Sequence, residues 1–220
     1  MSKLPSTMCD LLRPKSLADL TADPVIVARL TKMVETGSPM NMLFYGRSGI
    51  GKTSAARILI RELNADSLEL NGASNNSDRE FINKIVGFGS TISLNSNIKI
   101  CFIDEAENMT RFTQASLRHT IEKFSNNVRF IMTANSLRKI DPAIQSRCIP
   151  MCFDVTFGRQ REVIDRLTVS YRQRLSALGH ELETDVIRRI VVNYFPDMRK
   201  IADNFHSEIL GSEPIAAVAA

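Results

Sequence analysis

Short apolar runs alternate with helical patterns along the first two thirds of the chain. Runs typical of β-strands lie at 42–45, 67–70, 98–103, 128–134 and 149–153. Between them, apolar residues recur at helical spacing at 51–64, 78–88 and 111–124. Repeated strand and helix units of this kind favour a mostly parallel sheet. This part of the chain is therefore expected to be an α/β domain.

The pattern changes after Phe157 and Gly158, where only helical spacing continues. Helices are predicted at 159–178, at 183–194 and from about Pro196, because proline fits the first turn of a helix. The last ten residues carry no amphipathic pattern and are expected to form a loose tail. The predicted division is an α/β domain over 1–157, a helical domain over 158–210 and a tail over 211–220.

Composition narrows the function only slightly. The 220 residues suffice for a main domain with a smaller accessory one, and 44% hydrophobic with 24% charged residues is ordinary for a globular protein. The absence of tryptophan and the three tyrosines argue against an aromatic platform for stacking bases. A net charge of +4 suits a polyanionic partner and equally a solvated basic surface.

The cysteines do not suggest a metal site. Cys101 and Cys148 fall in apolar runs, and Cys9 and Cys152 have no paired spacing with them. The histidines are scattered, and none lies at ligand spacing from another candidate. Buried thiols are therefore expected at positions 101 and 148.

The segment GRSGIGKT at 46–53 fits the pattern GxxxxGK[ST], follows an apolar run and opens a helical pattern. Glycines let backbone N–H groups curve around the β-phosphate of ATP, and the helix adds the positive end of its dipole. Lys52 is expected to contact the β- and γ-phosphates, and the Thr53 hydroxyl to bind Mg²⁺. The predicted nucleotide-binding residues here are Gly46, Arg47, Ser48, Gly49, Ile50, Gly51, Lys52, Thr53 and Ser54.

Two carboxylates, Asp104 and Glu105, follow the apolar run at 98–103 and should emerge at the carboxyl end of a buried strand. Asp104 is expected to hold Mg²⁺ through its water shell. Glu105 is expected to orient and polarise the attacking water. An isolated acidic pair after a strand is usually a solvated strand end, but the preceding phosphate loop favours the catalytic interpretation.

Two more polar residues follow this region. Asn135 comes directly after the run at 128–134, where it would lie beside Asp104 and Glu105 and sense the γ-phosphate; capping of the next turn is the alternative. Arg147 ends a short helical pattern just before the last apolar run. An arginine at such a place is usually a surface charge or a partner of a helix C-terminus.

The segment IDPAIQSRC at 140–148 resembles the Ser-Arg-Cys motif of DNA sliding-clamp loader subunits of the replication factor C and phage type. In that family the arginine completes the ATP site of a neighbouring subunit, so the resemblance implies that Arg147 is a trans arginine finger in a ring or arc. The resemblance extends from about residue 12 to 208. It implies a P-loop AAA+ three-layer domain with a parallel five-stranded sheet, followed by a small three-helix lid domain.

Two further segments resemble nucleotide-contacting parts of the family. LRPKSLADL at 12–20 resembles the N-terminal box near the adenine, which implies base contacts from Arg13 and Pro14. PDMRK at 196–200 resembles the Gly-Asp-Met-Arg-Arg segment, whose first arginine reaches the γ-phosphate. Arg199 is therefore expected to be a second sensor that links lid closure to the nucleotide.

Two helical segments resemble interface elements of the family. SLRHTIE resembles the Leu-Arg-Arg-Thr-Met-Glu helix and implies an intersubunit or coupling role for Arg118; an ion pair with Glu122 at i,i+4 spacing is the alternative. The segment 78–84 corresponds to the helix that tracks the DNA backbone, which implies phosphate contacts from Arg79 and Lys84. An ordinary amphipathic helix is the alternative there.

The function implied is that of an ATPase subunit that uses ATP binding and hydrolysis to open a sliding clamp and place it on primer-template DNA. ATP and Mg²⁺ are the expected cofactors, and the clamp, the DNA and other loader subunits the expected partners. One alternative is another AAA+ machine, such as a helicase loader or a branch-migration motor, which the Ser-Arg-Cys segment disfavours. Another is a non-hydrolysing scaffold, which the intact Lys52, Asp104 and Glu105 disfavour.

Members of the family carry a third, helical collar domain, for which no residues remain after the predicted lid. A shortened chain or a naturally short relative is therefore expected. The N-terminus has no apolar stretch long enough for a signal peptide, and no segment approaches the length of a membrane-spanning helix. A cytoplasmic location, or a nuclear one in a eukaryote, is expected, without a membrane partner.

Overall fold

The computed structural model describes residues 7–20, 22–74, 77–92 and 98–212. The chain divides into two compact units, an α/β unit over Ser16–Asp154 and a helical unit that joins the segment up to Lys15 with the part from Val155 onward. The boundary expected after residue 157 lies close to this division. The first described residues differ from the expectation, because they belong to the helical unit.

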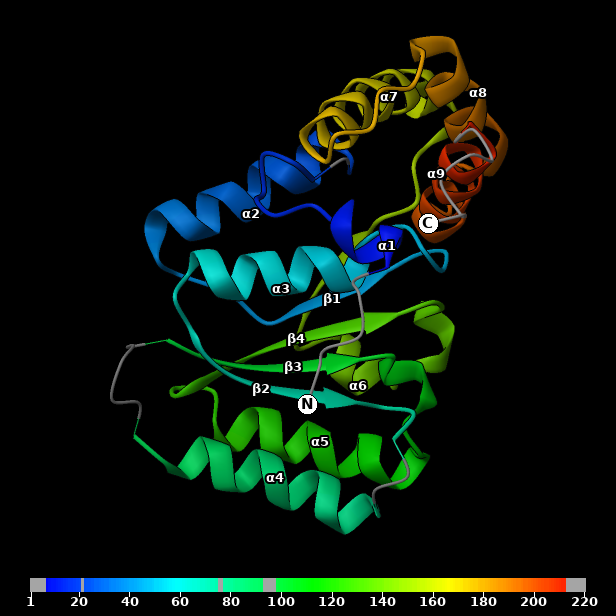
Figure 1. Cartoon of the computed structure of the whole chain (residues 1–220). Helices are drawn as coiled ribbons and strands as arrows, with labels where there is room; N and C mark the ends of the chain where they lie inside the picture. Colours follow the sequence, from blue (N-terminus) through cyan, green and yellow to red (C-terminus); the bar gives the residue numbers. More distant parts are fainter. Residues whose placement is uncertain (1–6, 21, 75–76, 93–97, 213–220) are drawn as a thin grey trace, which may run out of the picture. The chain divides into compact units, whose positions relative to one another are not determined.

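A parallel five-stranded sheet forms the centre of the α/β unit (Figure 1). Its strands are β1 (Met42–Tyr45), β2 (Asp66–Asn71), β3 (Lys99–Asp104), β4 (Val128–Ala134) and β5 (Ile149–Cys152). They lie in the order β2-β3-β4-β1-β5, and all four pairings are parallel. The carboxyl ends of the strands therefore share one edge of the sheet. This confirms the parallel sheet predicted from the sequence.

Helices cover both faces of the sheet (Figure 1). One face carries α2 (Pro24–Thr36) and α3 (Lys52–Glu62), and the other carries α4 (Asp78–Ser90) and α5 (Arg111–Lys123). Successive strand side chains point to opposite faces, so that Phe44 joins the first core and Leu43 the second. Burial on both faces explains why the strands are continuous apolar runs in the sequence.

Helix α2 is not among the predicted elements, although both of its ends carry clear signals. The Asp23 carboxylate caps the helix by accepting a hydrogen bond of 2.9 Å from the Val25 N–H, and Pro24 occupies the first turn. Gly37 ends the helix in the left-handed conformation, with φ 59°. Its buried residues are Ile26, Leu30 and Met33.

The helical unit packs around its own apolar core. It contains α1 (Met8–Leu11), α7 (Gln160–Ala177), α8 (Thr184–Tyr194) and α9 (Met198–Ser212). Leu12, directly after α1, is buried in this core, and the Arg174 guanidinium donates a hydrogen bond of 2.7 Å to its carbonyl oxygen. These contacts explain why the N-terminal segment belongs to the helical unit.

Helix α9 differs from the prediction at both ends. It begins at Met198 and not at Pro196, because the Asp197 carboxylate accepts hydrogen bonds from the backbone N–H groups of Arg199 at 3.1 Å and Lys200 at 3.3 Å. It extends to Ser212, so the start of the expected tail is helical. The remainder of that tail lies outside the described residues.

Shorter helical segments connect the strands of the α/β unit and lead into α7. They are α6 (Pro142–Gln145) and the 3₁₀ helices Ala106–Asn108, Leu137–Lys139 and Phe157–Arg159. Among the helices of the described ranges, none is both long enough and apolar enough to cross a membrane.

Candidate active site

The loop between β1 and α3 holds the predicted phosphate-binding segment. Gly46, Gly49 and Gly51 adopt φ angles of 140°, 77° and 100°, which are strained for any residue with a side chain. A β-carbon at Gly46 would lie 3.0 Å from Oδ1 of Asp154, whose carboxylate also accepts a 2.8 Å hydrogen bond from the Arg47 N–H. The tight turn therefore requires glycine, and it leads into the N-terminus of α3, where the helix dipole favours an anion.

Lys52, the first residue of α3, is buried with 7% of its surface exposed. Its Nζ donates hydrogen bonds to the carbonyl oxygens of Gly46 at 2.7 Å and Arg47 at 2.8 Å, and to Oδ1 of Asn135 at 3.0 Å. A buried ammonium group requires such partners. The structure thus brings together two predicted site residues that are far apart in the sequence.

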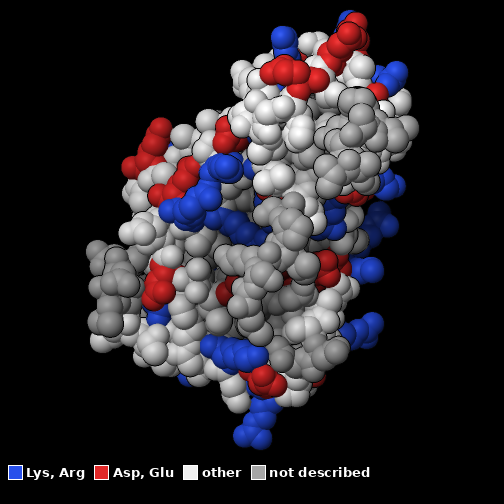
Figure 2. All heavy atoms as spheres, in the orientation of Figure 1, with Lys and Arg blue, Asp and Glu red and all other residues white. Residues whose placement is uncertain are grey.

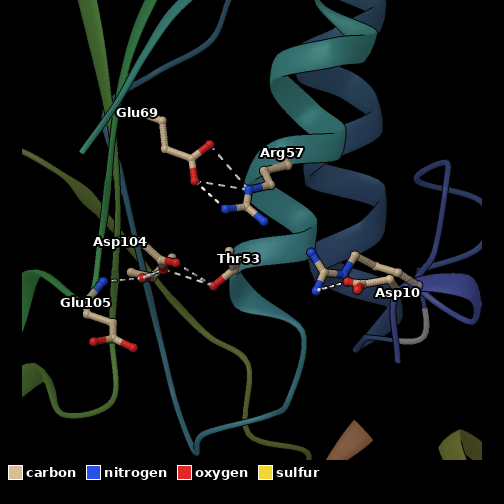
Figure 3. Close-up of polar contacts among 8 residues, drawn as sticks. Asp10, Thr53, Arg57, Glu69, Asp104 and Glu105 are labelled. Atoms are coloured by element: carbon tan, nitrogen blue, oxygen red, sulfur yellow. Dashed lines mark hydrogen bonds and ion pairs between the residues drawn. The ribbon is translucent and has the colours of Figure 1, made fainter. Parts of the chain in front are cut away.

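Thr53 and Asp104 meet beside Lys52. The Thr53 hydroxyl donates to Oδ1 of Asp104 at 2.9 Å and lies 3.2 Å from Oδ2, as Figure 3 shows. Thr133, on β4, donates to the same Oδ1 at 2.5 Å. Hydroxyl and carboxylate oxygens are hard donors of the kind Mg²⁺ prefers, so this pair fits the ion.

Arg57, one turn further along α3, does not join this pair. Its guanidinium hydrogen-bonds the Glu69 carboxylate on β2, with Nε 3.1 Å from Oε1 (Figure 3). This hydrogen bond is the main cause that raises the pKa of Arg57, to which the nearby charge of Asp104 adds.

Glu105 occupies a strained position directly after β3. Its φ of 54° lies in the left-handed region, which costs a residue with a side chain about 1 kcal/mol or more. The Thr133 hydroxyl accepts a 3.0 Å hydrogen bond from the Glu105 N–H, and the Glu105 carboxylate accepts one of 3.2 Å from Asn108. The Thr133 hydroxyl on β4 therefore contacts both the Asp104 carboxylate and the Glu105 backbone.

Two polar residues outside the predicted set form several hydrogen bonds: Glu107 contacts the site directly, and Gln114 joins the loops beside it. Oε1 of Glu107 accepts hydrogen bonds from the backbone N–H and the side-chain amide of Asn135, at 3.0 and 2.6 Å. Buried Gln114, on α5, donates to the carbonyl oxygens of Met109 and Lys139 and accepts from the Asp141 N–H at 2.7 Å. The sequence signal for Glu107 is its place two residues after Glu105, whereas Gln114 has no evident signal.

Arg147 lies at the amino-terminal ends of the strands, at the edge of the sheet opposite to the phosphate loop. It precedes β5, whose first residue Ile149 pairs with Met42 at the start of β1, whereas the phosphate loop follows the end of β1. The side-chain amide of Asn41 donates to the Arg147 carbonyl oxygen at 3.3 Å and fixes the backbone there. At about 3.3 Å per residue, the length of β1 separates Arg147 from the phosphate loop of its own chain by roughly 13 Å.

The Arg147 side chain is held by Glu122. Its Nε and terminal nitrogen both donate to Oε1 of Glu122, the former at 3.0 Å, and this hydrogen bond is the main cause that lowers the pKa of the Glu122 carboxyl. The alternative pairing of Glu122 with Arg118 is not formed. Arg118 instead lies 3.4 Å from the His119 ring nitrogen.

Three residues predicted to contact the nucleotide, Arg13, Pro14 and Arg199, lie in the helical unit. They are therefore not part of the group of site residues that the α/β unit brings together. The Arg13 guanidinium pairs with Asp10 at 3.1 Å, and Pro14 follows it in the chain. Arg199 is exposed in the first turn of α9.

The predicted DNA-contacting residues lie on α4. Lys84 forms an ion pair of 2.9 Å with Glu80, one turn earlier, and Arg79 is exposed. Figure 2 shows basic and acidic atoms side by side at the lower end of this face, where α4 lies. The helix therefore carries exposed charges of both signs.

A known protein family matches most of the α/β unit. The model of the ATPase family associated with various cellular activities (AAA) matches residues 42–153, which include the phosphate loop and both carboxylates.

Similar sequences carry one recurring name. A probable replication factor C subunit 5 of Dictyostelium discoideum is 35% identical over 71% of this chain and 49% of its own length. Replication factor C small subunits of Sulfolobus acidocaldarius and Methanoculleus marisnigri are 28% and 42% identical, over 91% and 62% of this chain and 81% and 44% of their own lengths. The chain thus spans about half the length of several of these relatives.

Solved structures share the fold. The Holliday junction branch migration motor RuvB of Thermotoga maritima superimposes with a TM-score of 0.68 at 19% identity, covering 88% of this chain and 63% of RuvB. A single-residue variant of the same RuvB gives a TM-score of 0.72 at 18% identity, over 87% and 63%. At such low identity the likeness concerns the fold alone.

Proposed function

Because the chain belongs to the ATPase family associated with various cellular activities (AAA) and is an ATP-hydrolysing P-loop enzyme, we propose that it serves as an ATPase subunit of a sliding-clamp loader. Its ATP binding and hydrolysis would open the clamp and place it on primer-template DNA. The similarity to replication factor C small subunits supports the clamp-loader assignment over the other AAA+ tasks.

The observation that carries the proposal is the position of Arg147 at the edge of the sheet away from the phosphate loop. An arginine so placed has no short path to the ATP of its own chain. It suits an ATP bound to a neighbouring subunit, where it would stabilise the charge of the transition state. The Glu122 pair would hold the guanidinium at the subunit surface until the neighbour's phosphates compete for it.

The phosphate loop and Lys52 would hold the β- and γ-phosphates. Lys52 already has the geometry of a multidentate donor, and phosphate oxygens would replace one or more of its present acceptors. Thr53 and Asp104 would hold Mg²⁺, with Asp104 acting through bound water. When bound, Mg²⁺ supplies positive charge that neutralises charge developing on the phosphates.

Glu105 would accept a hydrogen bond from the attacking water and orient it, and Asn135 would contact the γ-phosphate or that water. The Thr133 hydroxyl supports these roles, since it fixes both Asp104 and the Glu105 backbone. From the helical unit, Arg199 would reach the γ-phosphate, and Arg13 with Pro14 would contact the adenine.

Partner contacts complete the proposal. Arg79 and Lys84 would touch DNA phosphates, although the Glu80 pair must open for Lys84 to do so. Arg118, near the end of α5 that carries Glu122, would couple neighbouring subunits. A function with a clamp and DNA would place the protein in the cytoplasm or, in a eukaryote, in the nucleus.

The proposal is tested by steady-state ATP hydrolysis of the assembled loader, with and without its clamp and primed DNA. We expect clamp and DNA together to raise turnover several-fold in the wild type, and Glu105→Gln to abolish turnover in both conditions. A four-way DNA junction serves as the comparison substrate. Stimulation by the junction and none by clamp with primed DNA would transfer the assignment to branch migration.

A mixing experiment tests Arg147. Arg147→Ala chains keep the phosphate loop, and Lys52→Ala chains keep the finger, so each is inactive alone and the mixed oligomer should regain partial activity. Arg138→Ala is the matched control, because Arg138 is an exposed arginine on the preceding connection and should leave activity unchanged. Mixed oligomers that remain inactive would exclude a finger acting between chains.

A further inference from the structure

Glu107 fixes the position of Asn135 through two hydrogen bonds to a single oxygen atom. It lies in the 3₁₀ helix Ala106–Asn108, two residues after Glu105. Its Oε1 accepts from the Asn135 backbone N–H at 3.0 Å and from the side-chain Nδ2 at 2.6 Å. Because backbone and side chain of Asn135 are bound to the same atom, the amide has little freedom to rotate.

The charges on either side of the Asn135 amide determine which way it faces. Its Oδ1 accepts a 3.0 Å hydrogen bond from the Lys52 ammonium, while its Nδ2 faces the Glu107 carboxylate. The reversed amide would bring its hydrogens against the ammonium and its oxygen against the carboxylate, and both contacts would be repulsive. The order lysine, asparagine, glutamate therefore selects one orientation, and bonds to ionised groups are the stronger kind.

The second oxygen of Glu107 points to a role beyond packing. Oε2 is buried, and no group of the described residues forms a hydrogen bond with it. Burying a polar atom without a partner is unfavourable, so a carboxylate at this position costs stability that a smaller side chain would not. A compensating function is consistent with this cost.

We propose that Glu107 is a positioning residue for γ-phosphate recognition. It holds Asn135 so that one hydrogen of Nδ2 is bound to Glu107 and the other is directed to the γ-phosphate of ATP. This inference rests on the proposed function, because it takes the γ-phosphate contact of Asn135 from there. ADP lacks the γ-phosphate, so Glu107 should affect the affinity for ATP and leave that for ADP unchanged.

The test measures the binding of a fluorescent non-hydrolysable ATP analogue and of the corresponding ADP, each with Mg²⁺, to the whole chain. The ratio of the two affinities is compared among wild type, Glu107→Gln, Glu107→Ala, Asn135→Ala and the double variant Glu107→Ala/Asn135→Ala. Glu80→Gln is the matched control, since Glu80 is an exposed carboxylate on α4. Thermal unfolding of each variant reports whether it is folded.

We expect Glu107→Ala to lower the preference for the ATP analogue about tenfold, which is the order expected for lost hydrogen bonds to a charged group. Glu107→Gln should lower it about threefold, because its carbonyl oxygen accepts the same bonds without the charge. The double variant should match Asn135→Ala alone, since Glu107 acts through Asn135. Glu80→Gln should keep the wild-type ratio.

An unchanged ratio in folded Glu107→Gln would overturn the inference, even if the alanine variant failed to fold. Independent, multiplying effects of Glu107→Ala and Asn135→Ala would overturn it as well. Failure of the proposed function gives a different result, because a wild type that binds neither nucleotide, or binds both equally, lacks the γ-phosphate recognition on which Glu107 would act.

Discussion

Gly72 controls the position of Glu105 although it belongs to a different strand connection. It directly follows β2, and its N–H donates a 2.8 Å hydrogen bond to the Asp104 carbonyl oxygen. A β-carbon at this position would overlap the Glu105 carbonyl oxygen and lie 3.2 Å from Cγ of Met109. The substitution Gly72→Ala should therefore displace the backbone of Glu105.

The size of the effect follows from the displacement. Relief of the overlap requires a shift on the order of 1 Å, because non-bonded heavy atoms prefer about 3.5 Å. Overpacking of this kind costs about 1–3 kcal/mol of stability, and a misplacement of about 1 Å in an active site lowers turnover about 100-fold. ATP affinity should change little, because β3 and β4 separate β2 from the phosphate loop after β1.

The assay is steady-state ATP hydrolysis, with nucleotide binding measured in parallel. Gly87→Ala is the control: Gly87 is exposed within α4, and a β-carbon there meets nothing within 4 Å. It should keep wild-type turnover and gain about 0.5–1 kcal/mol of stability, the difference in helix propensity. Wild-type turnover in folded Gly72→Ala would refute the dependence of Glu105 on this contact.

Three further predictions concern stability and reactivity. Lys99→Met should lower the melting temperature, measured by calorimetry, by on the order of 10 °C, because the buried Lys99 ammonium hydrogen-bonds the carbonyl oxygens of Phe88, in the last turn of α4, and of Thr91, which directly follows the helix. Gln114→Leu should cost roughly 2–5 kcal/mol of the free energy of unfolding in urea, since it leaves the buried Met109 carbonyl oxygen and two partly buried backbone groups without the Gln114 side chain as a partner. Burial raises the pKa of Cys148 to about 12 and raises that of Cys101 further above the ordinary value, so at pH 8 both stay protonated. A chromogenic disulfide should then label exposed Cys152 at once and the two buried thiols only in denaturant.

The phosphate loop and the strands could be predicted because they depend on residues that are close together in the sequence. The phosphate loop needs glycines at fixed offsets and a lysine at the helix start, and both are local requirements that the chain meets between Gly46 and Lys52. The strands were equally evident because burial on both faces makes them continuous apolar runs. The pattern of apolar residues did not lead to a prediction of helix α2, although Asp23 and Gly37 mark its ends.

Features set by distant residues could not be predicted in the same way. Spacing on α5 suggested that Glu122 pairs with Arg118, but the structure pairs it with Arg147, which approaches from the segment before β5. Two hydrogen bonds from one guanidinium to the same carboxylate oxygen outweigh a single i,i+4 contact on a solvated helix. The contact of Asn135 with Glu107 was missed for a related reason. The sequence does not show which carboxylate near Glu105 lies beside Asn135 in the folded chain.

The order of the strands explains why the site exists at all. If the sheet followed the sequence, β2 would lie between β1 and β3, and Asn135 would emerge one strand beyond Asp104, away from Lys52. Instead β4 lies between β1 and β3, so its end touches the phosphate loop through Asn135 and the acidic strand through Thr133. The same parallel register sends Arg147 to the amino edge. One topology thus brings the predicted nucleotide-binding residues together at one edge of the sheet and places Arg147 at the other, as the proposed contact with a second chain requires.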